Sequence, residues 1–189
     1  DMRLQMDGDG TPFLFQPYAV VRSQISPVVT LQGGLNSMYF SYTNEFLLEP
    51  RVGAQFQFSR NTINVAYGTH SQILPFQTYE ATTTDSLTGV YAGKPNRELK
   101  MWRARHAAVS FSRAFSRSMR VKVEPYYQHL YRVPVSTDSW NSYSLINQDR
   151  NFFADSLTNN GTGYNAGVEL TFEKSFSNQL FFLLSGSVY

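Results

Sequence analysis

Residues 119–133, MRVKVEPYYQHLYRV, divide into an apolar face and a polar face at a period of two. One face carries Met119, Val121, Val123, Pro125, Tyr127, His129, Tyr131 and Val133, and the other carries Arg120, Lys122, Glu124, Tyr126, Gln128, Leu130 and Arg132. Alternation over this length predicts a β-strand. A strand of a soluble sheet usually has about five or six residues, whereas a tilted strand needs about nine to eleven to cross a bilayer. We therefore expect this stretch to span a membrane, with the apolar face toward lipid and the charged face toward a wet lumen.

Further segments alternate in the same way and give about eight antiparallel strands in all. The predicted strands are residues 13–24, with Pro17 as an irregularity, and residues 29–42, 48–59, 63–72, 106–112, 119–133, 164–173 and 180–184. Short Ser-containing turns are expected after every odd-numbered strand, and longer connections after every even-numbered one, above all residues 73–101 and 134–162. This asymmetry is typical of a transmembrane β-barrel in the bacterial outer membrane. A soluble β-sandwich is the weaker alternative, because it has no reason to place every long loop at one end.

Composition excludes several other classes of protein. No run of 18 or more apolar residues occurs, which excludes a transmembrane helix, whereas barrel strands hide their apolarity in alternation. A net charge of +2 without a polybasic tail gives no reason to expect a nucleic-acid partner. The absence of cysteine removes disulfides and thiolate metal sites.

Four sequence blocks together resemble the barrel domain of TonB-dependent outer-membrane receptors of the Bacteroidetes type. They are LEPR at 48–51, AYGTHSQ at 66–72, EPYYQHLYRVPV at 124–135 and NNGTGYNAGVELTFEK at 159–174. The resemblance rests on the combination and order of these four blocks.

The resemblance implies a barrel of about 22 strands that imports a bulky nutrient on energy delivered by TonB. Its expected partners are outer-membrane lipid, TonB acting through a plug domain, and a surface lipoprotein or other envelope proteins. The chain contains no plug-like segment and too few strands for such a wall, so we expect residues 1–189 to be an outer-membrane barrel segment of a longer polypeptide.

Charged residues on the predicted lumen face are the first candidates for function. They are Arg51, His70, Arg120, Lys122, Glu124, Arg132, Glu169 and Glu173. Such residues either contact a ligand or form cross-strand ion pairs that brace the wall. Substrate sites of these transporters lie mostly on the plug and outer loops, so the loop aromatics are the second set. Tyr79, Tyr91, Trp140, Tyr143, Phe152 and Phe153 either stack on sugars or planar ligands or pack the loops together.

No motif predicts catalysis, a cofactor or a metal site. His70, His106 and His129 are far apart in sequence without paired-ligand spacing, which favours solvated or packed histidines over metal ligands. The glycines at 161, 163 and 167 precede a strand rather than a helix, so they are interpreted as positions where neighbouring chains crowd and not as a phosphate loop. We therefore expect a protein that is not an enzyme.

Two alternatives to the uptake receptor remain open. The chain is either a complete eight-stranded barrel whose lumen is filled by side chains, or a receptor-like barrel that serves as a structural subunit of a larger outer-membrane assembly. In the second case the long outer loops are protein interfaces.

Overall fold

One large antiparallel sheet makes up most of the protein. The computed structural model describes residues 11–84, 91–147, 156–177 and 179–189. Within these residues the large sheet has nine strands, and a second, small sheet has two. The large sheet contains β1 (Leu14–Phe15), β2 (Tyr18–Ser26), β3 (Val29–Phe40), β4 (Glu45–Phe58), β5 (Asn61–Gln72), β8 (Trp102–Ala114), β9 (Met119–Ser136), β10 (Leu157–Ser177) and β11 (Leu180–Val188). The small sheet pairs β6 (Thr83–Thr84) with β7 (Tyr91–Gly93), and α1 (Phe76–Tyr79) is a single helical turn. The expectation of an all-β, antiparallel fold is confirmed.

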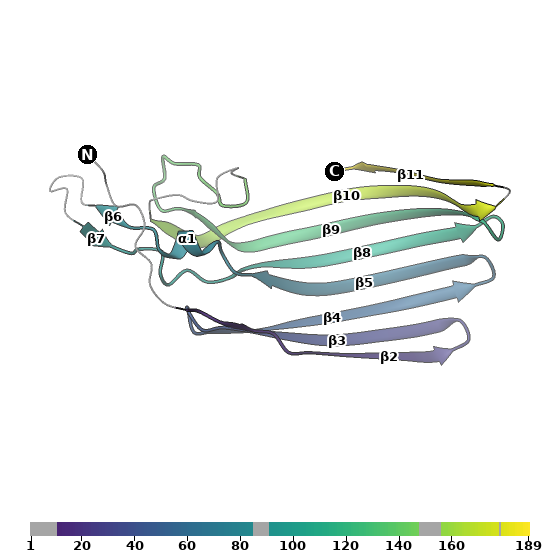
Figure 1. Ribbon diagram of the computed structural model, residues 1–189, viewed down its shortest axis with the longest axis horizontal. Helices are drawn as coiled ribbons and strands as arrows, with labels where there is room; N and C mark the ends of the chain where they lie inside the picture. The colour runs from purple at the N-terminus through teal and green to yellow at the C-terminus, as the bar shows by residue number, and fades with distance from the viewer. Residues whose placement is uncertain (1–10, 85–90, 148–155, 178) are drawn as a thin grey trace.

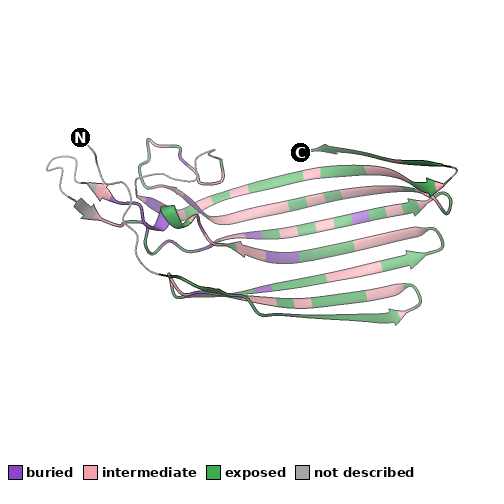
Figure 2. Ribbon diagram, in the orientation of Figure 1, coloured by how far each residue is buried: buried purple, intermediate pink, exposed green. Residues whose placement is uncertain are grey.

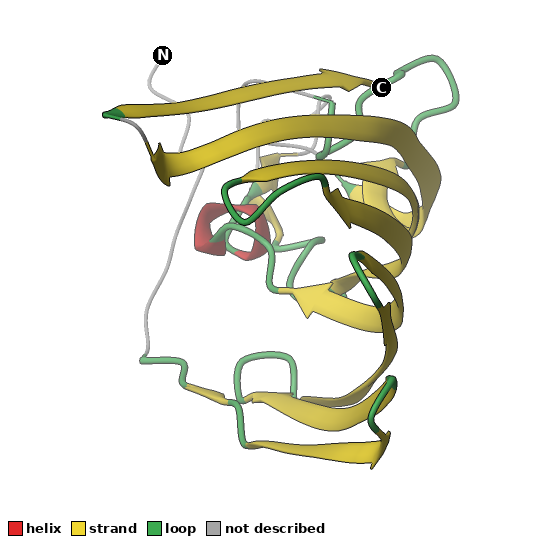
Figure 3. Ribbon diagram, turned by 90° about the vertical axis from the view of Figure 1, so that its right-hand side faces the viewer, coloured by secondary structure: helices red, strands yellow, loops and turns green. Residues whose placement is uncertain are grey.

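Consecutive long strands pair as hairpins, but the sheet is not closed. The order is β1-β3-β4-β5-β8-β9-β10-β11, with β2 also paired to β3 (Figure 1). In the described residues β2 and β11 are therefore the two edges. Viewed along the strands, the sheet is an arc with α1 on its concave side (Figure 3).

The first expected strand is divided in two at Pro17. β1 pairs Leu14 with Phe40, and β2 resumes the pairing with Tyr18 opposite Asn36. Proline has no backbone N–H to donate to the ladder, although its carbonyl still accepts a hydrogen bond from the Ser37 N–H at 3.0 Å. Eight alternating segments therefore correspond to nine strands.

The strands are longer than the alternation alone indicates. β8 extends the predicted 106–112 to 102–114, and β10 extends 164–173 to 157–177. As a result the 134–162 connection shrinks to residues 137–156. The connection at 41–44, expected to be one of the longer ones, is no longer than the turn at 115–118 at the opposite end, so the loop asymmetry rests on two connections only.

Strand register defines two chemically distinct faces. Directly paired residues of an antiparallel sheet point to the same side. The concave side carries the row Arg51, Gly68, His106, Gln128 and Asn165, and the convex side carries the row Val52, Tyr67, Ala107, Tyr127 and Ala166. Val52 and Tyr127 are 58% and 49% exposed, and exposed positions recur along every long strand (Figure 2).

A β-bulge at Arg132 ends the regular alternation of β9. Arg132 has a positive φ of 57°, and the register passes from Tyr131 opposite Thr162 to Val133 opposite Gly161. A bulge inserts one extra residue, so side chains beyond it swap faces. Val133, expected on the apolar outer face, is instead turned inward and is only 1% exposed. That assignment was wrong because a bulge leaves no mark in hydrophobic periodicity.

The hydrophobic core lies at the loop end of the sheet, on the concave side. Its members are Met38, Phe40, Leu47, Leu74, Tyr79, Leu99, Met101, Tyr143 and Leu157. Residues 73–101 contribute several of them, and the Tyr79 ring of α1 packs on Phe40 of β3 with centroids 5.8 Å apart. The described parts of this connection, residues 73–84 and 91–101, therefore form a folded cap over one end of the sheet, and we call them the cap.

Candidate functional site

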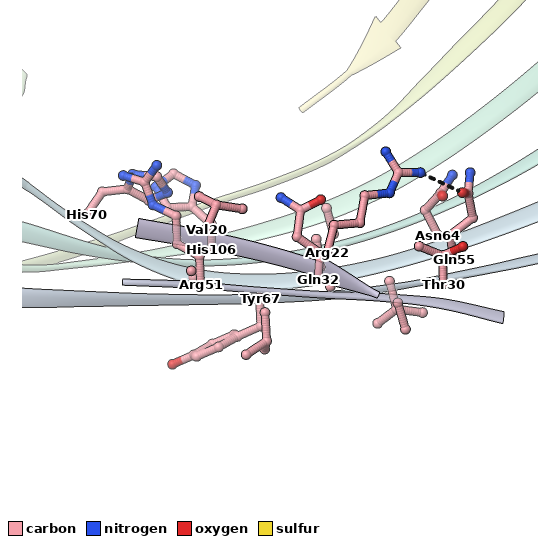
Figure 4. A pocket seen from close by; sticks show the side chains of 18 residues that line it. Val20, Arg22, Thr30, Gln32, Arg51, Gln55, Asn64, Tyr67, His70 and His106 are labelled. Atoms are coloured by element: carbon pink, nitrogen blue, oxygen red, sulfur yellow. Dashed lines mark hydrogen bonds between the residues drawn. The ribbon is translucent and has the colours of Figure 1, made fainter. Parts of the chain in front are cut away.

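The concave face presents a groove built by five neighbouring strands and lined by both polar and small apolar residues. A cavity of about 540 Å³ lies over β2, β3, β4, β5 and β8. Figure 4 shows the side chains of Arg22 and Gln32 on one side of the strands and Tyr67 on the other. Arg22 donates to the Gln55 side chain at 3.3 Å, and Asn64 donates to the Ser110 hydroxyl at 2.9 Å. The groove thus offers guanidinium, amide and hydroxyl groups. Along each strand, these inward side chains alternate with apolar side chains that point outward.

A chain of polar contacts lies at the cap end of this groove. Asn36 donates to the Glu49 carboxylate at 2.7 Å, and Arg51 approaches the same Oε2 atom at 3.4 Å. Arg51 Nη2 also lies 3.1 Å from His70 Nδ1. Because arginine can only donate, Nδ1 is the acceptor and the His70 proton sits on Nε2. The Glu49 side chain is 2% exposed, and Asn36 and Arg51 both reach its Oε2 atom, whereas its buried Oε1 atom has no hydrogen-bond partner among the described residues.

The structure brings His70 and His106 together. Their rings meet edge to face with centroids 4.6 Å apart, and His106 Nε2 lies 3.4 Å from the Gln128 amide. Sequence spacing gave no sign of this pair, because it depends on Gly68 standing opposite His106 in the register of β5 and β8. Arg51 and the two imidazoles form a cluster of donors suited to an anionic or hydroxyl-rich ligand.

At the turn end, four of the other predicted lumen charges form two ion pairs. Arg120 pairs with Glu173, and Lys122 pairs with Glu124. Glu169 stands directly opposite Glu124 and has no ion pair among the described residues. Only Arg120–Glu173 joins two strands, β9 and β10, as the bracing interpretation requires, since Lys122 and Glu124 both belong to β9.

Arg132 connects the sheet to the cap. Its guanidinium donates to Glu45 Oε1 at 2.9 Å, while Glu45 Oε2 accepts the Met101 N–H at 2.8 Å. Glu45 is 8% exposed. The bulge at Arg132 therefore directs a cation onto a buried carboxylate that also fixes the end of the cap.

The loop aromatics differ sharply in accessibility. Tyr79 is fully buried and Tyr143 is 6% exposed, and burial raises the pKa of Tyr79 to about 12 and raises that of Tyr143. Both rings pack within the core, as the packing alternative expects. Trp140 is 94% exposed. The side chain of Tyr91, and Phe152 and Phe153, lie outside the described residues.

A buried ion pair that the sequence did not predict holds the cap. Lys94 Nζ donates to Glu80 Oε2 at 2.6 Å, and the Tyr42 hydroxyl donates to Glu80 Oε1. Burial by itself raises the pKa of Glu80, but the hydrogen bonds from Lys94 and Tyr42, with the charges of Lys94 and Arg97, outweigh it and hold the pKa below its ordinary value.

The described residues contain no group of three or more His, Cys, Asp or Glu side chains placed to hold a metal ion. No helix among them is both long and apolar enough to cross a membrane. Comparison with protein-family models and with characterised proteins finds no match to this chain.

Proposed function

We propose that this sheet is part of the wall of a bacterial outer-membrane β-barrel, and that the barrel is a TonB-dependent receptor importing a bulky nutrient such as a glycan, a peptide or a metal chelate. The observation that best supports a membrane location is the distribution of charge on the convex face. Along the described strands of the large sheet, the charged residues on that face are Arg103, Arg105, Arg113 and Lys174, and all lie near strand ends.

The apolar band between these charges comes close to the height of the apolar band on outer-membrane barrels. On β8 the outward residues between Arg105 and Arg113 are Ala107, Val109 and Phe111. At about 3.4 Å per residue this interval is roughly 27 Å along the strand, or roughly 20 Å of height at a tilt of about 35–45°, close to the band of about 25 Å on outer-membrane barrels. Contact with lipid would explain why Val, Leu and Phe side chains are exposed on this face.

The open edges favour a larger barrel over a closed eight-stranded one. Backbone N–H and C=O groups cannot be left unpaired in hydrocarbon. In the described sheet β2 and β11 do not pair with each other. The proposal therefore requires additional strands beside both edges, which suits the wide barrel of the receptor class.

Paired cysteine substitutions test the membrane assignment. Leu31 is on the convex face and the neighbouring Gln32 lines the groove. Because this chain has no cysteine, Leu31→Cys and Gln32→Cys can be compared in the native full-length protein with any other cysteines replaced. A membrane-impermeant maleimide should label Gln32→Cys and leave Leu31→Cys protected until the bilayer is dissolved. Equal labelling in intact outer membranes would contradict lipid contact.

The uptake assignment needs a separate experiment. Strains lacking this protein, lacking TonB, or lacking both should show the same loss of growth on the imported nutrient when glycans, peptides and metal chelates are screened as sole sources. A protein that sits in the outer membrane but whose loss leaves uptake of every TonB-dependent nutrient unchanged is not a receptor.

The exposure of Trp140 favours a second candidate function, that of a barrel subunit which binds a partner protein through its outer loops. Tryptophan is enriched at the energetic centres of protein interfaces, and this ring is 94% exposed. Trp140→Ala should then release the partner from the purified complex, and assembly should persist without TonB. Loss of assembly on TonB deletion would exclude the scaffold role.

A further inference from the structure

Two arginines stand side by side on the convex face at the cap end of the apolar band. Arg103 and Arg105 are both outward residues of β8, and both lie over the ring of Tyr131 on β9. Their Cζ atoms are 5.6 Å and 5.0 Å from the ring centroid. The His129 ring stacks on the same tyrosine, with ring centroids 6.0 Å apart. We call Arg103, Arg105, His129 and Tyr131 the arginine–tyrosine cluster.

The two guanidinium groups keep most of their donors free of protein acceptors. Arg103 donates one hydrogen bond, to the Leu48 carbonyl at 3.0 Å, which fixes its position, while its buried Nε has no hydrogen-bond partner. Neither arginine forms an ion pair within the described residues. Each guanidinium carries five N–H donors in a planar fork that matches a phosphate group. The cluster is a pair of oriented cations without a protein anion.

The apolar residues next to the cluster favour an amphiphilic ligand. Directly toward the turn end on the same strand and face come Ala107, Val109 and Phe111, and on β9 the outward Tyr127 follows His129. A ligand that places an anionic group on Arg103 and Arg105 therefore finds apolar surface on one side of it. A soluble anion uses only the first half of this arrangement.

We propose that the arginine–tyrosine cluster binds the phosphate group of a membrane lipid, with the acyl chains lying on the apolar band below it. This inference rests on the proposed membrane location of the convex face. Arg103 and Arg105 supply charge-assisted hydrogen bonds to the phosphate oxygens, and the Tyr131 ring holds both guanidinium planes in place by cation–π contact. The arginine–tyrosine cluster is distinct from the groove over β2, β3, β4, β5 and β8, which lies on the opposite face of the sheet.

Competition between two lipids in reconstituted membranes tests the site. The native full-length protein is placed in phosphatidylcholine bilayers containing spin-labelled phosphatidylglycerol, or a spin-labelled neutral glycolipid with the same acyl chains. The immobilised fraction of each probe is measured by electron paramagnetic resonance. Phosphatidylglycerol should be retained preferentially. Arg103→Gln/Arg105→Gln should lower that preference about thirtyfold, since the two basic residues near a membrane surface contribute about 1 kcal/mol each.

Control variants distinguish lipid binding at the arginine–tyrosine cluster from a general effect of the protein's net charge. Arg22→Gln/Lys122→Gln removes the same charge from the concave face and should leave the lipid preference unchanged. Arg103→Lys/Arg105→Lys keeps the charge and should restore most of the preference. Equal effects of the two glutamine pairs, or no effect of Arg103→Gln/Arg105→Gln, would overturn the proposal.

The remaining outcomes would assign the cluster to a soluble phosphate compound or contradict the proposal. Excess inorganic phosphate should not displace phosphatidylglycerol, and full displacement would assign the cluster to a soluble phosphate compound instead. Immobilisation of both probes without preference leaves the membrane location intact and contradicts the lipid site. Immobilisation of neither probe contradicts the membrane location itself, and the lipid site falls with it.

Discussion

The hydroxyl end of Tyr126 on β9 lies over the backbone of Gly167, its direct partner on β10. A Cβ atom built at position 167 lies 2.7 Å from the Tyr126 hydroxyl and 2.7 Å from the Val188 carbonyl oxygen of β11. The ring and the next strand both occupy the space of a side chain. The sequence-based interpretation of this glycine as a crowded position is thereby confirmed, and that at Gly161 is too, where a Cβ lies 2.7 Å from the Val133 carbonyl oxygen.

Gly167→Ala should therefore destabilise the folded protein. Overpacking a filled site costs about 1–3 kcal/mol, and one of the two close atoms is backbone and cannot rotate away. Gly33→Ala is the matched control, because nothing lies within 4 Å of a Cβ there. Denaturant unfolding of both variants should show the loss at position 167 only. An equal loss at Gly33, where backbone entropy alone favours alanine, would mean that crowding at position 167 does not determine the effect.

Glu80→Gln should loosen the cap. The substitution keeps an acceptor for Tyr42 but removes the negative charge paired with Lys94, and hydrogen bonds to charged groups contribute about 1.5–3 kcal/mol. Amide hydrogen exchange across residues 73–101 should speed up, with little change in β9 and β10. Glu98→Gln, which alters an exposed carboxylate of the same connection, should leave exchange as it is. Unchanged protection in Glu80→Gln would refute the buried pair as the element that holds the cap.

Cap stability should also fall in acid. The folded-state pKa of Glu80 is depressed below its ordinary value of 4.5, so its contribution is fully present above that value and is lost as pH falls through the lower folded-state pKa. Hydrogen exchange in the cap, corrected for intrinsic rates, should therefore accelerate in a window below about pH 4.5. In Glu80→Gln this acid-dependent component should be absent. A cap that loosens equally in both proteins would assign the acid sensitivity to other groups.

Periodicity predicted the strands and their facing because both depend on neighbouring residues in sequence. It failed at Val133, since the bulge at Arg132 is a property of pairing with β10. It also could not predict the cap, whose defining contacts join distant residues, such as Glu45 with Met101 and Tyr42 with Glu80.

The candidate groove was predictable only in part. Parity predicted that Arg51 and His70 share a face, and both are on the concave side, but the meeting of His70 with His106 requires the register between β5 and β8. Tyr79 and Tyr143 could not be told from exposed loop aromatics, because burial in the cap depends on its tertiary fold.

Refolding into lipid bilayers tests the central claim, that the convex face meets hydrocarbon and the concave face meets water. Val168 and Glu169 are neighbours on opposite faces of β10, with Val168 45% exposed. An arginine at the midplane of a barrel costs about 2–4 kcal/mol, so Val168→Arg and Val121→Arg should lower stability in bilayers by roughly that amount. Lys122→Ala and Glu169→Gln should change it little, since both are on the concave face and the Lys122–Glu124 pair is partly solvated. If arginine on the valine face costs no more than the substitutions on the Lys122 face, the convex face does not lie in lipid.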